Sequence, residues 1–353
     1  MPRRRLSERQ RQRIQAIQER RRRRLESRTN AVLDKLDADR AAEVEPDAQS
    51  EPAVQPGLVV VRHGAHLAVE DAAGNLHHCM TRSNIGHPVC GDRVVWQPTG
   101  DGGVVTALEA RHNVLSRPDY SGRDKPLAAN LTLMAVVVAP QPPPSGFLLD
   151  QYLVAAELMG VRALVVAAKM DLLDDVGHAA FLDALAPYRD LGYAICPISI
   201  KGAPGVAALT EHLAGETAIL LGQSGVGKSS LVQALLPDQD IQVGRLSEAT
   251  GFGRHTTSAA TCYRLPGDQA GGGVGGGRLI DSPGVRSFRL TGLTQAELEQ
   301  GFRELAPLRG HCRFRDCRHL DEPDCAVRTA VAEGSIDPRR LEHFHHLREG
   351  LVR

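Results

Sequence analysis

The pattern of apolar and polar positions first predicts a small barrel. Between residues 57 and about 114, short runs rich in β-branched side chains are separated by Gly, Asn and Asp. They cover residues 58–61, 67–69, 93–96 and 104–108. Short strands punctuated by turn residues at this spacing are typical of a β-barrel.

From residue 130 onward the apolar runs become longer and alternate less. Four of them, at residues 131–139, 163–168, 195–199 and 217–221, have the pattern of buried parallel strands. Helical patterns at residues 148–159 and 178–191 lie between them. This alternation predicts an α/β sheet with helices on both faces.

Three further segments have other patterns. Residues 29–56 mix acidic residues with Ala, Gln and Pro and have few large apolar side chains, which predicts a linker that does not fold alone. Residues 267–277 are mostly Gly and predict a flexible hairpin tip or insertion. After residue 293 the pattern is helical, with a metal-binding type of loop between two helical stretches.

Charge is distributed unevenly along these 353 residues, although the formal net charge is zero. Residues 1–28 hold twelve Arg against three Glu, and residues 31–56 hold seven carboxylates against two basic residues. The basic head either contacts nucleic-acid phosphates or is a solvated, partly helical tail, and the sequence leaves both open.

Composition also bears on the compartment. The Arg run is not followed by the apolar stretch of an export signal, and no run approaches the ~18 apolar residues of a membrane span. The odd, scattered count of seven Cys argues against a disulfide scaffold. We therefore expect a cytoplasmic protein without membrane association.

A complete phosphate-binding loop follows the strand pattern at residues 217–221 and precedes a helical pattern. Its glycines turn backbone N–H groups toward phosphate oxygens, Lys228 reaches the β and γ phosphates, and the Ser229 hydroxyl is a magnesium ligand. The predicted nucleotide-binding residues of this loop are Gly222, Gln223, Ser224, Gly225, Val226, Gly227, Lys228, Ser229 and Ser230.

Two companion motifs follow the loop along the chain. Asp281 ends an apolar strand in Asp-Ser-Pro-Gly, where its carboxylate can hold the magnesium shell and the Gly284 N–H can sense a γ phosphate. Residues 253–257 read Gly-Arg-His-Thr-Thr, so Thr256 or Thr257 is a second magnesium ligand, with Thr256 our choice.

Base recognition is predicted upstream of the phosphate loop. Lys169 and Asp171 follow a strand, and a carboxylate there accepts hydrogen bonds from guanine N1–H and its amino group, which adenine does not offer. The Lys169 stem covers the ring face. Ser199 and Lys201 follow the next strand and border the base. Ala168 stands where Asn is usual, which removes one polar contact and predicts lower nucleotide affinity.

The order of these motifs indicates circular permutation. An ordinary GTPase has its phosphate loop first, whereas here both base-reading loops precede it. A parallel sheet that is cut in one loop and joined at its old ends keeps every strand in place. The motifs together predict a GTP-hydrolysing P-loop protein.

Hydrolysis needs a residue that aligns water, and Val285 occupies the position after the Asp-x-x-Gly motif where Gln is often found. His255 is our candidate catalytic residue with Lys228 and Thr256, because a neutral imidazole accepts a water proton. The alternative is that His255 contacts RNA or caps its loop. Arg254 either neutralises γ-phosphate charge or meets RNA phosphate.

A cysteine and histidine cluster near the C-terminus predicts a metal. Cys312, Cys317, His319 and Cys325 offer three thiolates and one imidazole, the set for a closed tetrahedral zinc site. Such a site is structural, because it leaves no open coordination position. His311 is an alternative ligand to His319.

These motifs together resemble the RsgA (YjeQ) family of ribosome-associated GTPases over residues 57–353. The resemblance implies an all-β OB-fold barrel, a circularly permuted α/β P-loop GTPase and a mainly α zinc domain. It implies that the protein binds GTP and GDP, is stimulated by the small (30S) ribosomal subunit during late maturation, and grips 16S rRNA. Ala168, the Gly-rich insert, residues 251–252 and the basic head depart from the family pattern.

We therefore predict a head and linker at residues 1–56, an OB-fold at 57–114, the GTPase at 115–292 and the zinc domain at 293–353. A monomer with one structural zinc ion, and magnesium bound with GTP, is expected. One rival hypothesis is an RNA-binding assembly factor with a weakened guanine pocket and little GTPase activity. The other is a P-loop kinase or ATPase, which does not explain Lys169, Asp171 and Ser199 at strand ends.

Overall fold

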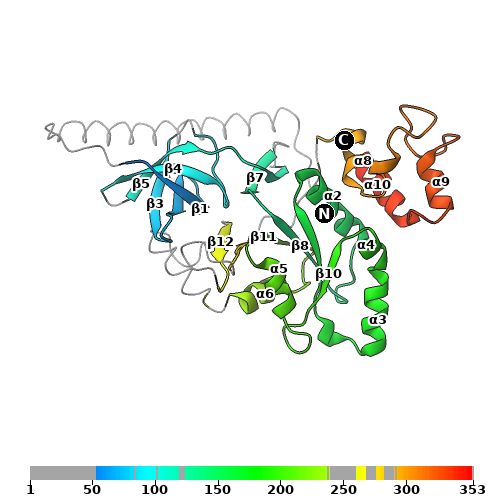
Figure 1. Cartoon of the computed structure of the whole chain (residues 1–353), viewed down its shortest axis with the longest axis horizontal. Coiled ribbons are helices and arrows are strands. Elements are labelled where there is room, and N and C mark those ends of the chain that lie inside the picture. The colour runs from blue at the N-terminus through cyan, green and yellow to red at the C-terminus, as the bar shows by residue number, and fades with distance from the viewer. Residues whose placement is uncertain are drawn as a thin grey trace, which may run out of the picture. The chain divides into compact units, whose positions relative to one another are not determined.

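The structure is a computed structural model that describes residues 53–82, 85–100, 102–118, 124–236, 238, 260–267, 276–281, 290 and 292–351 (Figure 1). All of them belong to one compact unit, residues 52–353. No helix in this described part is long and apolar enough to cross a membrane.

In the described N-terminal part, five strands close into a barrel (Figure 1). They are β1 (Gln55–His63), β2 (His66–Glu70), β3 (Leu76–Thr81), β4 (Arg93–Thr99) and β5 (Gly102–Leu108). The strands pair in the order β1-β2-β3-β5-β4, and β4 pairs back onto β1. This ring confirms the predicted OB-fold barrel. Strand β3 was not predicted, because its central His77 and His78 hide the apolar pattern.

The barrel is filled around Trp96, which is 1% exposed. Its ring lies against two strand glycines, where a side chain has no room. A Cβ on Gly57 would stand 2.4 Å from Val69 Cγ1, and one on Gly103 would stand 2.4 Å from Trp96 Cε3. The glycines therefore let the backbone approach the core residue closely.

The central sheet contains five parallel strands in the described residues. They are β8 (Leu133–Val138), β9 (Arg162–Ala167), β10 (Ala194–Pro197), β11 (Thr217–Leu221) and β13 (Arg278–Asp281), in the spatial order β10-β9-β8-β11-β13. The predicted apolar runs are buried, as in β8, where every residue is buried. An antiparallel strand, β12 (Thr261–Arg264), continues the sheet, and it pairs with β1 of the barrel through Val61 and Thr261.

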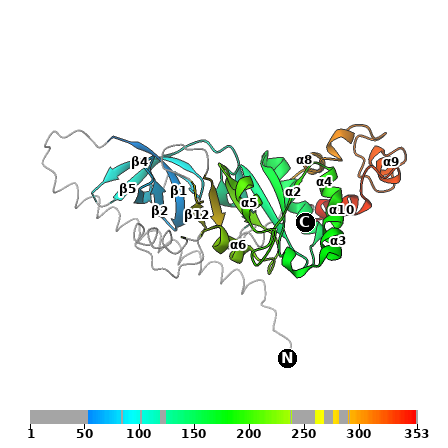
Figure 2. The same cartoon turned by 60° about the horizontal axis from the view of Figure 1, so that its bottom comes forward.

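Helices cover both faces of this sheet, as predicted. Figures 1 and 2 show α5 (Ala207–Leu213) and α6 (Lys228–Leu235) on one face and α2 (Gly146–Met159) and α4 (Ala186–Asp190) on the other. The predicted helix over 178–191 is two helices, α3 (Asp175–Ala184) and α4, because Pro187 at the start of α4 has no N–H to continue the first helix.

The hairpin of β6 (Val114–Pro118) and β7 (Asp124–Ala129) was not predicted. Strands β12 and β13 form an antiparallel hairpin, so the Gly-rich run does join two paired strands. The tip of that run, residues 268–275, lies outside the described residues.

Spatial and sequential order disagree in the way that permutation requires. Strand β11, which leads into the phosphate loop, lies between β8 and β13, yet β8, β9 and β10 all precede it along the chain. Because the five strands are parallel, the loops after β8, β9, β10, β11 and β13 all leave the same edge. In parallel α/β sheets this edge binds ligands.

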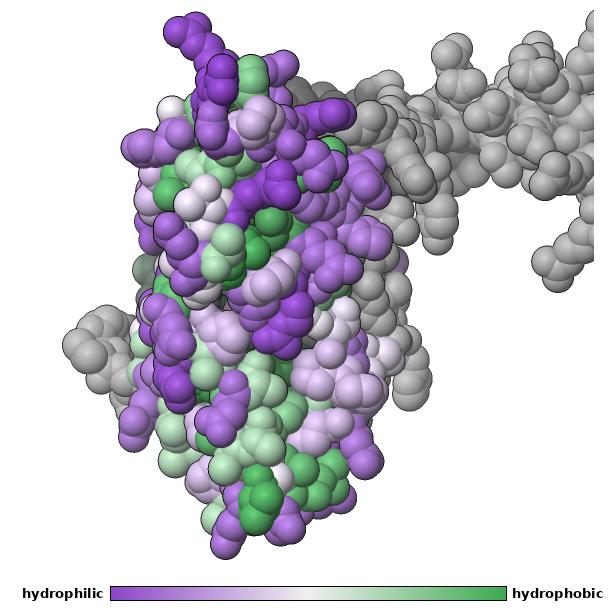
Figure 3. Space-filling view, turned by 90° about the vertical axis from the view of Figure 1, so that its right-hand side faces the viewer, coloured by the Kyte–Doolittle hydropathy of each residue, from purple (hydrophilic) through white to green (hydrophobic). Residues whose placement is uncertain are grey.

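The C-terminal region is helical, with α8 (Gln295–Gly301), a 3-10 turn at Ala306–Leu308, α9 (Ala326–Ala332) and α10 (Pro338–Leu351). Helix α8 begins with a capping box between Thr294 and Glu297. Its last residue packs closely against α2, because a Cβ on Gly301 would lie 2.5 Å from Val154 Cγ1. Figure 3 shows the face at the right-hand side of Figure 1. Its upper part is mostly hydrophilic, and apolar residues gather in its lower part, where α3 lies.

A buried charged cluster joins α10 to α2. Arg340 Nη1 donates to Asp150 Oδ1 at 2.6 Å, and His343 Nδ1 and Asp150 Oδ2 are 2.5 Å apart. Glu304 accepts two more bonds from Arg340, at 2.5 and 2.9 Å. Asp150 and Arg340 are 0% and 2% exposed, so this Asp150 cluster replaces the hydration of both charges.

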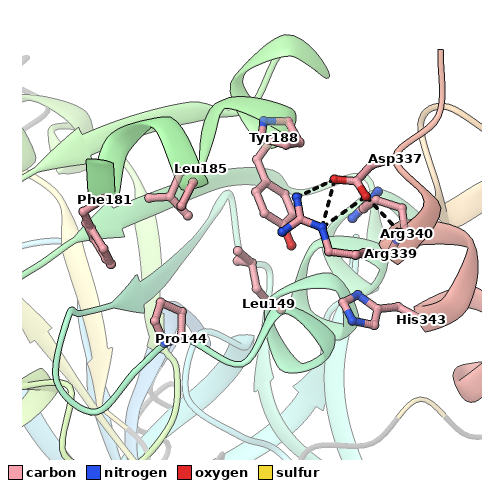
Figure 4. A pocket seen from close by; sticks show the side chains of 12 residues that line it. Pro144, Leu149, Phe181, Leu185, Tyr188, Asp337, Arg339, Arg340 and His343 are labelled. Carbon is pink, nitrogen blue, oxygen red and sulfur yellow. Dashed lines mark hydrogen bonds and ion pairs between the residues drawn. The ribbon is translucent and has the colours of Figure 1, made fainter. Parts of the chain in front are cut away.

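A pocket of about 320 Å³ opens beside this cluster (Figure 4). Leu149, Phe181 and Leu185 form an apolar wall, and Arg339 with its partner Asp337 lies on the polar side. None of the predicted nucleotide-binding residues lines it. This pocket is therefore part of the seam between α2, α3, α4 and α10 and not the nucleotide site.

Candidate functional site

The phosphate loop lies where the sequence placed it, between β11 and α6. Gly222, Gly225 and Gly227 have φ values of 130°, 84° and 102°, which side chains rarely adopt. A Cβ on Gly222 would also stand 2.3 Å from Val137 O. The loop conformation therefore requires these glycines, and it presents its backbone beside the start of α6.

Both predicted lysines lie against the loop. Lys228 Nζ donates to Gly222 O and Gln223 O, each at 2.7 Å. Lys169 Nζ donates to Gly225 O at 2.7 Å and to Gln141 O at 2.9 Å. The predicted base-reading segment after β9 and the phosphate loop after β11 thus meet, although Lys169 and Gly225 lie 56 positions apart in the sequence.

The two predicted base-reading loops also meet. Ser199 Oγ donates to Asp171 Oδ1 at 2.5 Å and accepts from the N–H groups of Lys201 and Gly202 at 3.2 and 3.1 Å. Ser199 is 1% exposed, whereas Asp171 is exposed. A buried hydroxyl therefore orients a carboxylate that remains accessible to a ligand.

Ala168 is buried, and its N–H donates to Val138 O at 2.8 Å. It thus continues the pairing of β8 and β9 and offers no polar side-chain atom to the site.

Sequence reasoning missed the proline-rich loop after β8. Gln223 Nε2 donates to Pro143 O at 2.8 Å, and Gln223 Oε1 accepts from Ser145 N at 3.2 Å. Lys169 reaches the same loop at Gln141. Its position after a buried parallel strand was the available signal, since every such loop meets the site edge.

Two of the residues predicted to bind magnesium lie at the same edge of the sheet. Ser229 is exposed in the first turn of α6, and Asp281 is exposed at the end of β13, one residue beyond Ile280, which pairs with Ile219 of β11. A hydroxyl and a carboxylate are hard oxygen donors that suit magnesium. The predicted Arg254, His255, Thr256 and Gly284 lie outside the described residues.

The four predicted zinc ligands come together. The donor atoms of Cys312, Cys317, His319 and Cys325 all lie within 4.8 Å of one another. Cys312 Sγ is 3.6 Å from His319 Nδ1 and 3.8 Å from Cys325 Sγ, and His319 Nδ1 is 3.3 Å from Cys325 Sγ. His311 is not among them, so the imidazole of this set is His319. Three thiols and one imidazole fit a closed zinc site.

Glu299 on α8 orients this imidazole, and sequence reasoning missed it. His319 Nε2 lies 3.1 Å from Glu299 Oε1, which leaves Nδ1 facing the thiols. Gln295 Nε2 donates to Glu299 Oε1 at 2.8 Å and to Cys317 O at 2.7 Å. Burial would raise the pKa of Glu299, but the hydrogen bonds from His319 and Gln295 outweigh it and lower the pKa.

The cluster is strained and electrostatically mixed. His319 has φ 60°, a conformation that non-glycine residues adopt at a cost. Burial would raise the pKa of Cys325, but hydrogen bonds from the Arg328 N–H at the start of α9 and from its neighbours lower it. Burial and the adjacent thiols raise the pKa of Cys317 to about 12. A divalent cation would favour the thiolate form of Cys317 as well.

The fold and its site define a class. A parallel sheet with a phosphate loop, two predicted base-reading loops earlier in the chain and a Cys₃His cluster near its C-terminus define a circularly permuted P-loop GTPase with an N-terminal β-barrel.

Comparison with known proteins gives the family. Residues 108–291 match the model of the RsgA GTPase. A protein of Azotobacter vinelandii, "Small ribosomal subunit biogenesis GTPase RsgA", is 43% identical over 98% of this chain and 97% of its own length. The same name is borne by a protein of Hahella chejuensis that is 40% identical over 99% of this chain and 97% of its own length. The chain therefore belongs to the RsgA GTPase family.

Solved structures support this assignment. YjeQ from Thermotoga maritima superposes with a TM-score of 0.68 at 29% identity and covers 85% of this chain and 99% of its own. YloQ, described as a circularly permuted GTPase, superposes with a TM-score of 0.65 at 27% identity and covers 87% and 98%. The permutation inferred from motif order is thus confirmed. The family match supports a GTP hydrolase and not an RNA-binding factor with little GTPase activity.

Proposed function

We propose that this protein binds GTP and hydrolyses it to GDP and phosphate during late maturation of the small (30S) ribosomal subunit, and that the subunit stimulates this reaction. The relatives that share over 40% of its residues are named for small-subunit biogenesis. The contact that carries the proposal is that of Ser199 with Asp171, because it joins two loops into a base-reading edge beside the phosphate loop.

Guanine selection follows from the accessible carboxylate. Asp171 accepts hydrogen bonds from guanine N1–H and the 2-amino group, while Ser199 fixes its direction and Lys201 borders the base. Adenine has no N1–H and no 2-amino group to donate, so the same carboxylate disfavours ATP. The stem of Lys169 lies between this edge and Gly225 and covers the ring face.

The phosphates lie along the loop from Gly222 to Ser229. Backbone N–H groups of the loop and the start of α6 bind their oxygens, and Lys228 leaves the carbonyls that it now contacts to neutralise the β and γ phosphates. Ser229, Asp281 and Thr256 would hold magnesium, which would neutralise part of the negative charge on the phosphates. The Gly284 N–H senses the γ phosphate.

His255 is the residue that we assign to aligning the attacking water. Val285 has no polar atom, so another side chain must take this role. Replacing His255 by Ala should slow GTP turnover with little change in GTP affinity. An equal loss of affinity and turnover would contradict the assignment, because it would indicate a binding role.

One structural zinc ion in the Cys₃His cluster would hold the loop between α8 and α9. The barrel and this zinc domain grip 16S rRNA, since an OB-type barrel presents strands and loops suited to nucleic acid. We propose that the protein acts as a monomer in the cytoplasm, with domain boundaries near residues 57, 115 and 293.

The deciding experiment is GTP turnover with and without purified small subunits. We expect stimulation, with large subunits and Lys228→Ala protein as matched controls. Turnover that small subunits leave unchanged would refute the proposed function. A preference for GTP over ATP that Asp171→Asn abolishes would separately support the base-reading edge.

A further inference from the structure

We infer that His178 is a positioning residue for guanine selectivity, an inference that rests on the proposed base-reading role of Asp171. Its Nε2 lies 2.6 Å from the carbonyl oxygen of Met170. The carbonyl only accepts, so the imidazole donates. His178 lies at the end of the first turn of α3, outside every loop that the motifs identify.

The bonded carbonyl belongs to the peptide that leads into Asp171. The Met170 C=O and the Asp171 N–H share one planar peptide unit. A hydrogen bond that holds the oxygen therefore also fixes the position of the Asp171 Cα, from which the side chain starts. Met170 is 0% exposed, and its N–H donates to Ile198 O at 3.2 Å. The side of this segment that faces the core is therefore anchored from two neighbouring elements.

The segment needs such anchoring because its backbone is unfavourable. Lys169 has φ 59°, a left-handed conformation that residues other than Gly adopt at a cost. Met170 O accepts hydrogen bonds from two donors, Leu173 N at 3.1 Å and the imidazole of His178. Removal of the imidazole leaves this carbonyl one partner, so the turn can relax without leaving an unpaired buried group.

The imidazole is held in place by the start of α3. Asp174 caps this helix and accepts from Gly177 N at 2.8 Å, and His178 N donates to Asp174 O at 2.8 Å. The side chain is half-buried. His178 therefore acts from a fixed position on Met170 and, with Ser199 on the other side, defines where the Asp171 carboxylate lies.

The test compares GTP with ITP, whose base lacks the 2-amino group but is otherwise the same. The ratio of their dissociation constants reports the contact between Asp171 and that group, and general loss of stability does not change it. We expect His178→Ala and His178→Leu to lower the preference for GTP about three- to tenfold, the worth of one well-placed hydrogen bond. The turnover number on GTP should change less than twofold.

Matched variants keep the outcome clear. His178→Gln places an amide donor near the original Nε2 and should restore the preference, and His212→Ala on α5 should leave it unchanged. His178→Leu keeps a large side chain, whereas His178→Ala does not. If one of the two variants does not fold, the other still gives the ratio of dissociation constants. A preference within twofold of the parent protein in both would overturn the inference.

A cycle with Asp171→Asn separates this inference from the proposed function. Asp171→Asn should abolish the preference, and adding His178→Leu should then change the ratio less than twofold. If Asp171→Asn retains the preference, the proposed base-reading edge is wrong. If it loses the preference but His178→Leu lowers the ratio equally in both backgrounds, His178 acts independently of Asp171 and the inference is wrong.

Discussion

Replacing Asp150 by Ala should destabilise the protein through the seam between α2 and α10. Asp150 accepts from Arg340 at 2.6 Å and lies 2.5 Å from His343 Nδ1, with no exposed surface of its own. Breaking a buried ion pair by removing one partner costs about 3–5 kcal/mol. Because Arg340 keeps both bonds to Glu304, we expect about 3 kcal/mol, the lower end of that range.

The electrostatics of the cluster support this magnitude. Burial would lower the pKa of Arg340, but its hydrogen bond to Glu304 and the charge of Asp150 raise it. Loss of one carboxylate removes part of that compensation and leaves the burial cost. Burial and Asp150 also raise the pKa of Tyr188, which lines the pocket beside the cluster (Figure 4).

Urea unfolding followed by far-ultraviolet circular dichroism measures the loss. Asp183→Ala on the exposed side of α3 is the control and should change the free energy of unfolding by less than about 0.5 kcal/mol. The double variant Asp150→Ala with Arg340→Met should lose at least about 1 kcal/mol less free energy of unfolding than the two single variants lose in sum. A loss below about 1 kcal/mol for Asp150→Ala would show that the cluster contributes little.

Three further predictions concern the metal cluster, the phosphate loop and the barrel. Glu299→Gln should weaken zinc affinity about 10- to 100-fold in competition with a chelator, since it loosens the His319 ring; unchanged affinity would contradict the orienting role. Gln223→Ala should raise the dissociation constants of GTP and GDP by a similar factor of about five in calorimetric titration, because it removes the hydrogen bonds that hold the proline-rich loop with either nucleotide bound. Weaker binding of GTP alone would indicate a γ-phosphate contact instead. Burial would raise the pKa of Glu70, but its two arginine partners lower it below the ordinary 4.5, so its stabilising contribution is complete above that pH and is lost as the pH falls; Glu70→Gln should remove this acid-dependent loss in urea titrations.

Local patterns sufficed for much of this fold. The strands β8, β9 and β11 and the phosphate loop were predictable. Their signals, continuous apolar runs and glycines at fixed spacing, each lie within a short stretch of the sequence. The four metal-cluster residues were predictable for the same reason. Pro187 indicated the split of the predicted helix into α3 and α4, but the prediction followed the apolar periodicity across residues 178–191 instead.

The remaining features depend on contacts between distant residues. Glu299 precedes His319 by 20 residues, and nothing near it distinguishes it from an ordinary helix carboxylate. His178 bonds a backbone oxygen, which no motif records. The strand β3 is held by its partners β2 and β5 more than by its own composition. Such residues become visible only when the fold brings their partners close.

The barrel contacts the hairpin that follows His255 and Thr256 in the sequence. Ala260 follows His255 by five residues, and the Cys90 thiol donates to Ala260 O at 3.0 Å. The next residue, Thr261, pairs with Val61 of β1. Glu70 of β2 then binds Arg264 and Arg278 on the two strands of the β12–β13 hairpin, at 2.8 and 2.6 Å. Thr261 also pairs with Asp281, the predicted magnesium ligand, so one strand of the hairpin lies between the barrel and this carboxylate.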